Sequence, residues 1–140
     1  MRPLPRLAAV LCLLALTLPG CSSKSGGSNS TTKPIVIGLS LDTVREERWQ
    51  RDCDEFVKRA TELGATVKVQ VANNDDARQN AQCENLLTQG IDVLVVAPHN
   101  SESAATIVKS AHQAGVPVIA YDRLINQCDV DLYMSFDNVE

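Results

Sequence analysis

The stretch from Ile35 to Arg51 constrains the fold more than any other part of the chain. It opens with an apolar run, 35–39, passes through a polar loop, 40–44, and then enters a helical pattern near Arg45 or Glu46. A near-continuous apolar run that leads directly into a helix is typical of a buried strand in a parallel sheet. In such sheets, ligands bind beyond the carboxyl ends of the strands. We therefore expect the loop after this strand to carry the function.

The rest of the chain repeats this alternation of strand and helix. The apolar patterns predict strands over 35–41, 66–72, 93–97, 116–121 and 131–135, and helices over 45–63, 76–89 and 102–114. A glycine follows each predicted helix (Gly64, Gly90 and Gly115), and glycine is the residue best suited to a left-handed helix end. The alternation predicts an α/β fold with a doubly wound parallel sheet. The last strand approaches Glu140 with no helix to cover it, so we expect a truncated product or an incomplete sequence.

The start of the chain is typical of an exported bacterial protein. Arg2 and Arg6 precede an apolar run over 7–18, which is too short for a membrane-spanning helix because spanning takes about 20 residues. Residues 1–20 are therefore predicted to be a signal peptide. The sequence Leu-Pro-Gly-Cys that ends at Cys21 resembles a bacterial lipobox, which implies cleavage before this cysteine and its acylation. An ordinary secretory signal with an incidental cysteine is the alternative.

A polar segment separates this leader from the alternating pattern. Residues 22–33 contain only Ser, Gly, Asn, Thr and Lys, so they have no apolar side chain to bury in a core. We expect residues 21–33 to form a flexible, lipid-anchored tether. The tether would hold a folded lobe, residues 34–140, away from the membrane.

Charge and motifs argue against several classes of function. Cleavage after residue 20 would remove two of the 13 basic residues and none of the 17 acidic ones, which leaves a net charge of −6 and disfavours a nucleic-acid partner. The sequence contains no glycine-rich phosphate loop, no Gly-x-Ser-x-Gly motif and no Cys-x-x-Cys, and His99 and His112 lack metal-ligand spacing. We therefore expect no enzyme activity, no metal and no cofactor.

Three cysteines, Cys53, Cys83 and Cys128, remain in the predicted lobe. In an exported chain, two of them could form a disulfide. However, Cys53 and Cys83 fall on the apolar stripes of their predicted helices, which is typical of small buried hydrophobic residues. The sequence favours this second interpretation and leaves the first open.

Polar and aromatic side chains follow two of the predicted strands. They are Asp42, Arg45, Arg48 and Trp49 after the first strand, and Asp122 and Arg123 after the fourth. The carboxyl ends of parallel strands lie at one edge of a sheet, so we expect these side chains to face one another. Asp122 could accept a hydrogen bond from one sugar hydroxyl while Arg48 and Arg123 donate to others, and an indole could cover the C–H face of the ring. The alternative is that Asp122 and Arg123 only close a loop and that Trp49 belongs to the core.

Four segments of the chain carry a family resemblance. They are Asp42-x-x-Arg45-x-x-Arg48-Trp49-Gln50, Gly90-Ile91-Asp92-Val93-Leu94-Val95-Val96-Ala97-Pro98, Tyr121-Asp122-Arg123-Leu124-Ile125-Asn126 and Tyr133-Met134-Ser135-Phe136-Asp137-Asn138. Together they resemble the amino-terminal lobe of the type I periplasmic sugar-binding family, and the Arg-Trp and Tyr-Asp-Arg motifs resemble its xylose-binding branch. The resemblance covers nearly all of residues 34–140. It implies sugar contacts at Arg48, Trp49, Asp122 and Arg123, with Asp42 and Arg45 lining the same mouth.

The resemblance also implies a function. Members of this family close two lobes around a sugar and deliver it to the permease subunits of an ABC importer. We therefore expect a lipid-anchored receptor, on the periplasmic or extracellular face of a bacterial cell membrane, that binds a monosaccharide, with D-xylose as the leading candidate. The alternative is a sugar-sensing ligand subunit for a membrane chemoreceptor or histidine kinase. The contacts made by a second lobe would lie beyond Glu140.

Overall fold

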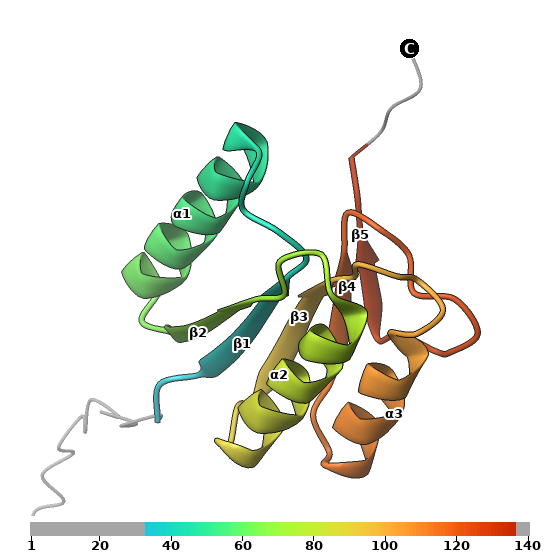
Figure 1. The fold of residues 1–140 in the computed structure, drawn as a ribbon. Helices are drawn as coiled ribbons and strands as arrows, with labels where there is room; N and C mark the ends of the chain where they lie inside the picture. The colour runs from blue at the N-terminus through green and yellow to red at the C-terminus, as the bar shows by residue number, and fades with distance from the viewer. Residues whose placement is uncertain (1–32, 137–140) are drawn as a thin grey trace, which may run out of the picture. The chain divides into compact units, whose positions relative to one another are not determined.

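The computed structural model describes residues 33–136, which form a three-layered α/β fold (Figure 1). The elements are β1 (Val36–Leu41), α1 (Glu47–Glu62), β2 (Thr66–Val71), α2 (Asp76–Thr88), β3 (Val93–Ala97), α3 (Ala105–Gln113), β4 (Val118–Tyr121) and β5 (Leu132–Met134). The strands of this region form a parallel sheet in the order β2-β1-β3-β4-β5. The predicted doubly wound parallel sheet is therefore confirmed. The predicted signal peptide (1–20) and the acylation site Cys21 lie outside the described residues, as does the predicted tether except for its last residue.

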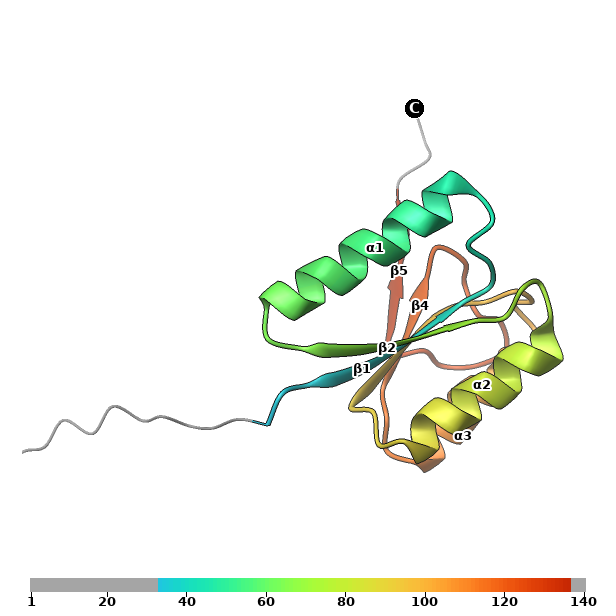
Figure 2. The same ribbon diagram turned by 60° about the vertical axis from the view of Figure 1, so that its left-hand side comes forward.

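The helices divide between the two faces of the sheet (Figure 2). α1 packs on one face, and α2 and α3 pack side by side on the other. Each face has its own core, and β3 contributes to both: Leu94 and Val96 belong to the core with α2 and α3, and Val95 and Ala97 belong to the core with α1. All four side chains are buried, as is typical of a parallel strand covered on both faces.

Two predicted helix starts are wrong because loop hydrogen bonds compete with the helix. α1 begins at Glu47 rather than at residue 45, since the Thr43 hydroxyl accepts a hydrogen bond from the Arg45 N–H (3.1 Å) in the preceding loop. α3 begins at Ala105 rather than at residue 102. There the side chain of Asn100 accepts from two backbone N–H groups and stabilises a separate turn before the helix.

The other predicted boundaries need one further correction. β4 begins at Val118 rather than at residue 116, because Pro117 has no N–H to donate to a neighbouring strand. All remaining predicted bounds agree with the structure to within one residue. Gly64, Gly90 and Gly115 follow the helices with φ values of 83°, 71° and 72°, so their predicted role as left-handed helix ends is confirmed.

The three cysteines of the described region are free thiols. Cys83 is buried in the core beneath α2 and α3, and burial raises the pKa of its thiol to about 11. Cys53 and Cys128 are half-buried and pack against the two cores. The interpretation as buried hydrophobic residues is therefore confirmed for Cys83 and holds in part for Cys53.

Candidate functional site

Three loops meet at the carboxyl edge of the sheet. They follow β1, β3 and β4 and comprise residues 42–46, 98–104 and 122–123; together with the first turn of α1 we call them the strand-end rim (Figure 1). β1 and β3 are neighbours in the sheet, but the helices that follow them lie on opposite faces. Such a switch point is where an open α/β sheet forms a crevice for a ligand.

Arg48 and Asp122 connect the start of α1 to the end of β4. The Nη2 group of Arg48 donates a hydrogen bond to Oδ1 of Asp122, and this bond raises the pKa of the guanidinium. Asp122 has a left-handed backbone (φ 65°), and its N–H donates to the carbonyl of Met134 (2.8 Å), which helps to fix the direction of the carboxylate. The predicted juxtaposition of these two loops is therefore confirmed.

Asp42 is buried in the rim and connects two further loops. Its side chain is only 5% exposed. One carboxylate oxygen accepts a hydrogen bond from Nη1 of Arg123 (3.0 Å), and the other lies 2.8 Å from Nδ1 of His99. The same Nη1 group of Arg123 also donates to the carbonyl of Pro98 (3.1 Å). Both oxygens of Asp42 are thus paired inside the protein, so its geometry favours holding Arg123 rather than reaching a ligand.

Trp49 belongs to the core beneath α1. It is 6% exposed and packs with residues of β1 and β3. The guanidinium carbons of Arg48 and Arg123 lie 5.0 Å and 5.8 Å from the centre of its ring, and Tyr121 meets it edge-on. The structure therefore supports a core role for Trp49, in which the indole also makes cation–π contacts with two arginines. The contact between Trp49 and a sugar stays a prediction.

The structure differs from the predicted residue set at three positions. Arg45 is exposed, and among residues 33–136 its guanidinium has no hydrogen-bond or ion-pair partner. His99 and Phe136 are not among the predicted site residues, although Nδ1 of His99 lies 2.8 Å from Asp42 and the Phe136 ring lies 4.4 Å from the guanidinium carbon of Arg48. His99 is the second residue after β3, so it shares the signal that singles out Asp42 and Asp122, a polar residue just beyond a strand.

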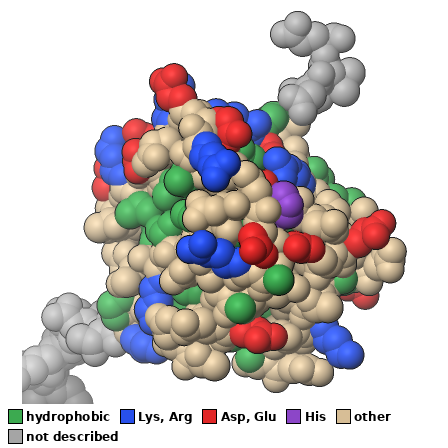
Figure 3. Space-filling model, in the orientation of Figure 1, with side chains coloured by type: hydrophobic (Ala, Val, Ile, Leu, Met, Phe, Trp, Pro, Cys, Tyr) green, Lys and Arg blue, Asp and Glu red, His purple; other side chains and the backbone are tan. Residues whose placement is uncertain are grey.

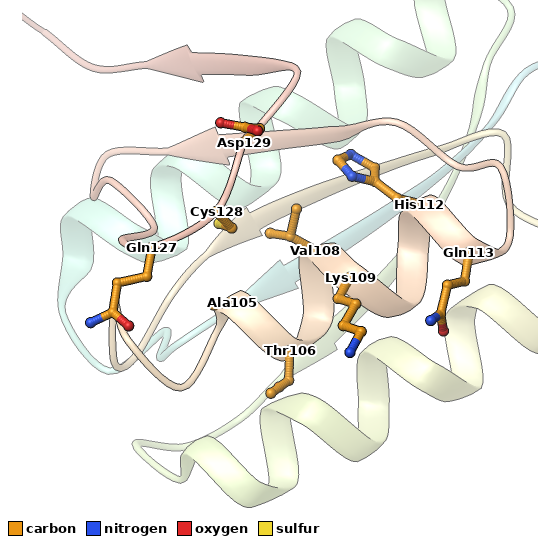
Figure 4. Close-up of a pocket in the computed structure, with 9 residues that line it drawn as sticks. All are labelled: Ala105, Thr106, Val108, Lys109, His112, Gln113, Gln127, Cys128 and Asp129. Atoms are coloured by element: carbon orange, nitrogen blue, oxygen red, sulfur yellow. The ribbon is translucent and has the colours of Figure 1, made fainter.

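A separate hollow of about 610 Å³ lies along α3 and the segment 127–129 (Figure 4). It is lined by Ala105, Thr106, Val108, Lys109, His112, Gln113, Gln127, Cys128 and Asp129, and by none of the six predicted site residues.

Within residues 33–136, no three His, Cys, Asp or Glu side chains are grouped closely enough to hold a metal ion. None of the helices in this part of the chain has both the length and the apolar content needed to cross a bilayer.

The fold and the rim define a lobe of a periplasmic solute-binding protein. The chain matches the periplasmic binding protein domain family over residues 37–140, and it belongs to that family. It is 50% identical to the D-xylose-binding periplasmic protein of Haemophilus influenzae over 111 residues, which are 79% of this chain and 33% of that protein. It is also 50% identical to the Escherichia coli protein of the same name over 106 residues, 76% of this chain and 32% of that one.

A solved structure supports the same assignment. An ABC transporter solute-binding protein from Clostridium phytofermentans with bound β-D-glucose superimposes with a TM-score of 0.71 at 36% sequence identity. The match covers 74% of this chain and 32% of that one. The chain thus spans about a third of the length of the relatives that it matches. These relatives carry the names of binding proteins, in agreement with the expectation that the chain is not an enzyme.

Proposed function

We propose that this chain forms the amino-terminal lobe of a lipid-anchored receptor that binds a monosaccharide, preferably D-xylose, and delivers it to the permease subunits of an ABC importer. The observation that carries this proposal is the paired arrangement at the strand-end rim, where Arg48 is held by Asp122 and Arg123 is held by Asp42. The 50% identity to two D-xylose-binding proteins supports the choice of sugar.

The rim offers the groups that a sugar needs. The side chains of Arg48 and Arg123 are 47% and 42% exposed, so N–H groups that their partners do not use can donate to hydroxyl oxygens. The Oδ2 atom of Asp122 lies 4.0 Å from Nε of Arg123, at the outer limit of an ion pair, so it can accept from a hydroxyl. Hydrogen bonds that involve a charged partner are about twice as strong as neutral ones.

The charge balance of the rim favours a neutral ligand. Arg48 and Arg123 are each paired with a carboxylate, and the rim also contains Glu46 and Glu102 beside Arg45, so little net positive charge remains to attract a phosphate. On the face shown in Figure 3, basic and acidic side chains also lie intermixed rather than in a basic patch. A sugar without a phosphate group fits this pattern better than a phosphorylated one.

The test is isothermal titration calorimetry on a chimaera in which residues 33–136 replace the matching third of the Haemophilus influenzae relative. We expect D-xylose to bind more tightly than D-ribose or D-glucose, and D-xylose 5-phosphate to give no heat. The 140-residue chain alone should bind weakly or not at all, because a second lobe would supply the remaining contacts. The unmodified relative is the control. A folded chimaera that gives no heat with any of the three sugars would overturn the proposal.

A further inference from the structure

A buried polar network lies directly under the strand-end rim. Gln79, on α2, is 1% exposed. Its amide nitrogen donates to the Ser40 hydroxyl (3.2 Å) and to the Ala97 carbonyl (3.0 Å), which ties α2 to the ends of β1 and β3. Its amide oxygen accepts from the backbone N–H of His99 (2.9 Å). The backbone of His99 is therefore fixed from below by a buried side chain.

The side chain of His99 continues this network to the surface. Its Nδ1 atom lies 2.8 Å from one oxygen of Asp42, and the other oxygen of Asp42 accepts from Arg123 at 3.0 Å. Asp42 is almost fully buried, so each of its oxygens requires a donor. The two donors cannot replace each other, because His99 lies in the loop after β3 and Arg123 in the loop after β4, and each faces a different oxygen of Asp42.

We infer that His99 is a positioning residue of the sugar site, which holds Asp42 in the orientation that aims Arg123 at the ligand; this inference rests on the proposed function. Nδ1 of His99 must carry a proton to donate to Asp42, and in the absence of this donor the carboxylate has one buried oxygen unpaired. Asp42 can then turn toward water or draw a second N–H from Arg123. In either case the guanidinium loses the direction in which its free N–H groups point.

The first experiment needs no sugar. Trp49 is the only tryptophan of the chain, and the guanidinium of Arg123 lies 5.8 Å from its ring centre. A movement of Arg123 should therefore change the fluorescence of Trp49. We expect His99→Phe, which keeps a ring but cannot donate, to change the emission of the 140-residue chain. His99→Asn, whose amide nitrogen takes the place of Nδ1, should leave the emission as it is.

The chain provides a matched control in His112. Its Nε2 atom lies 2.8 Å from Asp131, so it is also a histidine paired with a carboxylate, but it is on α3 and outside the rim. His112→Phe should leave the emission of Trp49 unchanged. If His99→Phe does not fold, His99→Gln replaces it, because the glutamine amide reaches the place of Nε2, which does not face Asp42. Unchanged emission in a folded His99→Phe variant, or in His99→Gln, would contradict the inference.

The second experiment measures sugar affinity in the chimaera. We expect His99→Phe to weaken D-xylose binding roughly tenfold, which is the scale of leaving one buried acceptor unpaired, while His99→Asn keeps most of the affinity. In an Asp42→Asn background, His99→Phe should cause no further loss of affinity, because His99 acts on Arg123 only through its hydrogen bond to Asp42. A purely structural role for His99 would instead give additive losses and no rescue by asparagine.

The two proposals fail in different ways. A chimaera without substitutions that binds no sugar defeats the proposed function. The fluorescence comparison then still tests whether His99 fixes the position of Arg123. A chimaera that binds D-xylose equally well with and without His99→Phe defeats the inference and leaves the proposed function standing.

Discussion

Arg48 is held on three sides before any ligand arrives. Its guanidinium donates to Asp122, lies 5.0 Å from the ring centre of Trp49 and lies 4.4 Å from that of Phe136. A planar guanidinium has a fixed fork of donors, so contacts on its faces and one edge set the direction of the remaining N–H groups. For the proposed sugar contact of Arg48, binding would then cost less side-chain entropy than it would for a free arginine.

This arrangement predicts the effect of removing either partner. Arg48→Ala and Asp122→Ala should each lower the sugar affinity of the chimaera at least tenfold, because the partner is left unpaired and a ligand contact is lost. Calorimetry with D-xylose is the measurement. Arg51→Ala is the matched control, since Arg51 lies one turn further along α1, is paired with Glu47 (2.6 Å) and is mostly exposed. Undiminished affinity in both variants would remove the pair from the site.

At the residue scale, the sequence predicted which loops lie together but not the contacts of each side chain. Parallel strands bring their carboxyl ends to one edge, so Arg48, Asp122 and Arg123 could be placed together from the alternation of strands and helices. Whether Arg45 or Arg48 reaches β4 depends on where α1 begins, and a shift of two residues changes which side chain faces the sheet. The sequence could not show that Asp42 is buried, because its burial is produced by two loops that are distant in the chain.

At the element scale, local signals decided which boundaries were predicted well. α2 begins where predicted, and the side chain of Asp75 accepts the N–H of Arg78 as a helix cap. The residues that precede α1 and α3, Glu46 and Ala104, make no side-chain cap hydrogen bond. Without a cap residue, nothing local in the sequence marks the first turn, and these are the helices whose starts were wrong.

The packing of β1 against α2 and β3 predicts a stability effect at Gly38. A Cβ atom at this position would lie 2.7 Å from Cδ1 of Ile91 and 3.3 Å from the Cδ1 atoms of Leu86 and Leu94. All three neighbours are buried, so Gly38→Ala should lower the free energy of unfolding by about 1–3 kcal/mol, as overpacking does. Urea unfolding followed by circular dichroism measures this change.

A second substitution separates overpacking from other effects at Gly38. Ile91→Val removes the Cδ1 atom that lies closest to the added methyl group. In this background, Gly38→Ala should cost clearly less than it does alone, although Ile91→Val itself costs about 0.5–1.5 kcal/mol. Equal costs in the two backgrounds would show that the contact with Ile91 does not limit the packing.

Tyr121 connects β4 to α1 and predicts a dependence of stability on pH. The pKa of Tyr121 is raised from an ordinary value of 10.0 to about 12. Burial is the largest cause, and the hydrogen bond from its hydroxyl to Asp52 (2.8 Å) is the second. Between these values the folded state keeps a proton that the unfolded state releases, so stability is full below pH 10.0 and falls as pH rises toward 12. Tyr121→Phe should flatten this part of the stability curve.

A second variant separates the two causes of the raised pKa of Tyr121, burial and the contact with Asp52. Asp52→Asn removes the carboxylate but leaves the burial of Tyr121, so it should lower the pKa of the phenol only part of the way toward its ordinary value. Each chain and its Tyr121→Phe counterpart are titrated with base, and their ultraviolet absorbance is recorded. The difference between the two curves gives the pKa of Tyr121. A midpoint near 10 in the unsubstituted chain would contradict the structure.

At the scale of the whole molecule, the described residues form one lobe, and the proposed site lies at the carboxyl edge of its sheet. Arg48 and Arg123 stay nearly half exposed, although each is held by a carboxylate and lies near the ring of Trp49. Hinge closure by a second lobe is the kind of motion that would bury such groups around a ligand. The division of the chain into residues 1–20, 21–33 and 34–140 stays a prediction, because the first two segments lie almost wholly outside the described residues.

The predicted lipid anchor is tested by the distribution of the whole chain in a cell that processes bacterial lipoproteins. Acyl chains contribute about 0.8 kcal/mol per buried CH₂ group, and two or more chains hold a protein on a membrane that one chain holds only marginally. Cys21→Ala removes the acceptor, so the exported lobe should move from the membrane fraction to the soluble fraction. Cys53→Ala removes a free thiol of the lobe and should leave the protein with the membranes. If the Cys21→Ala variant stays in the membrane fraction after a wash with high salt, the ordinary secretory signal becomes the better interpretation of the leader.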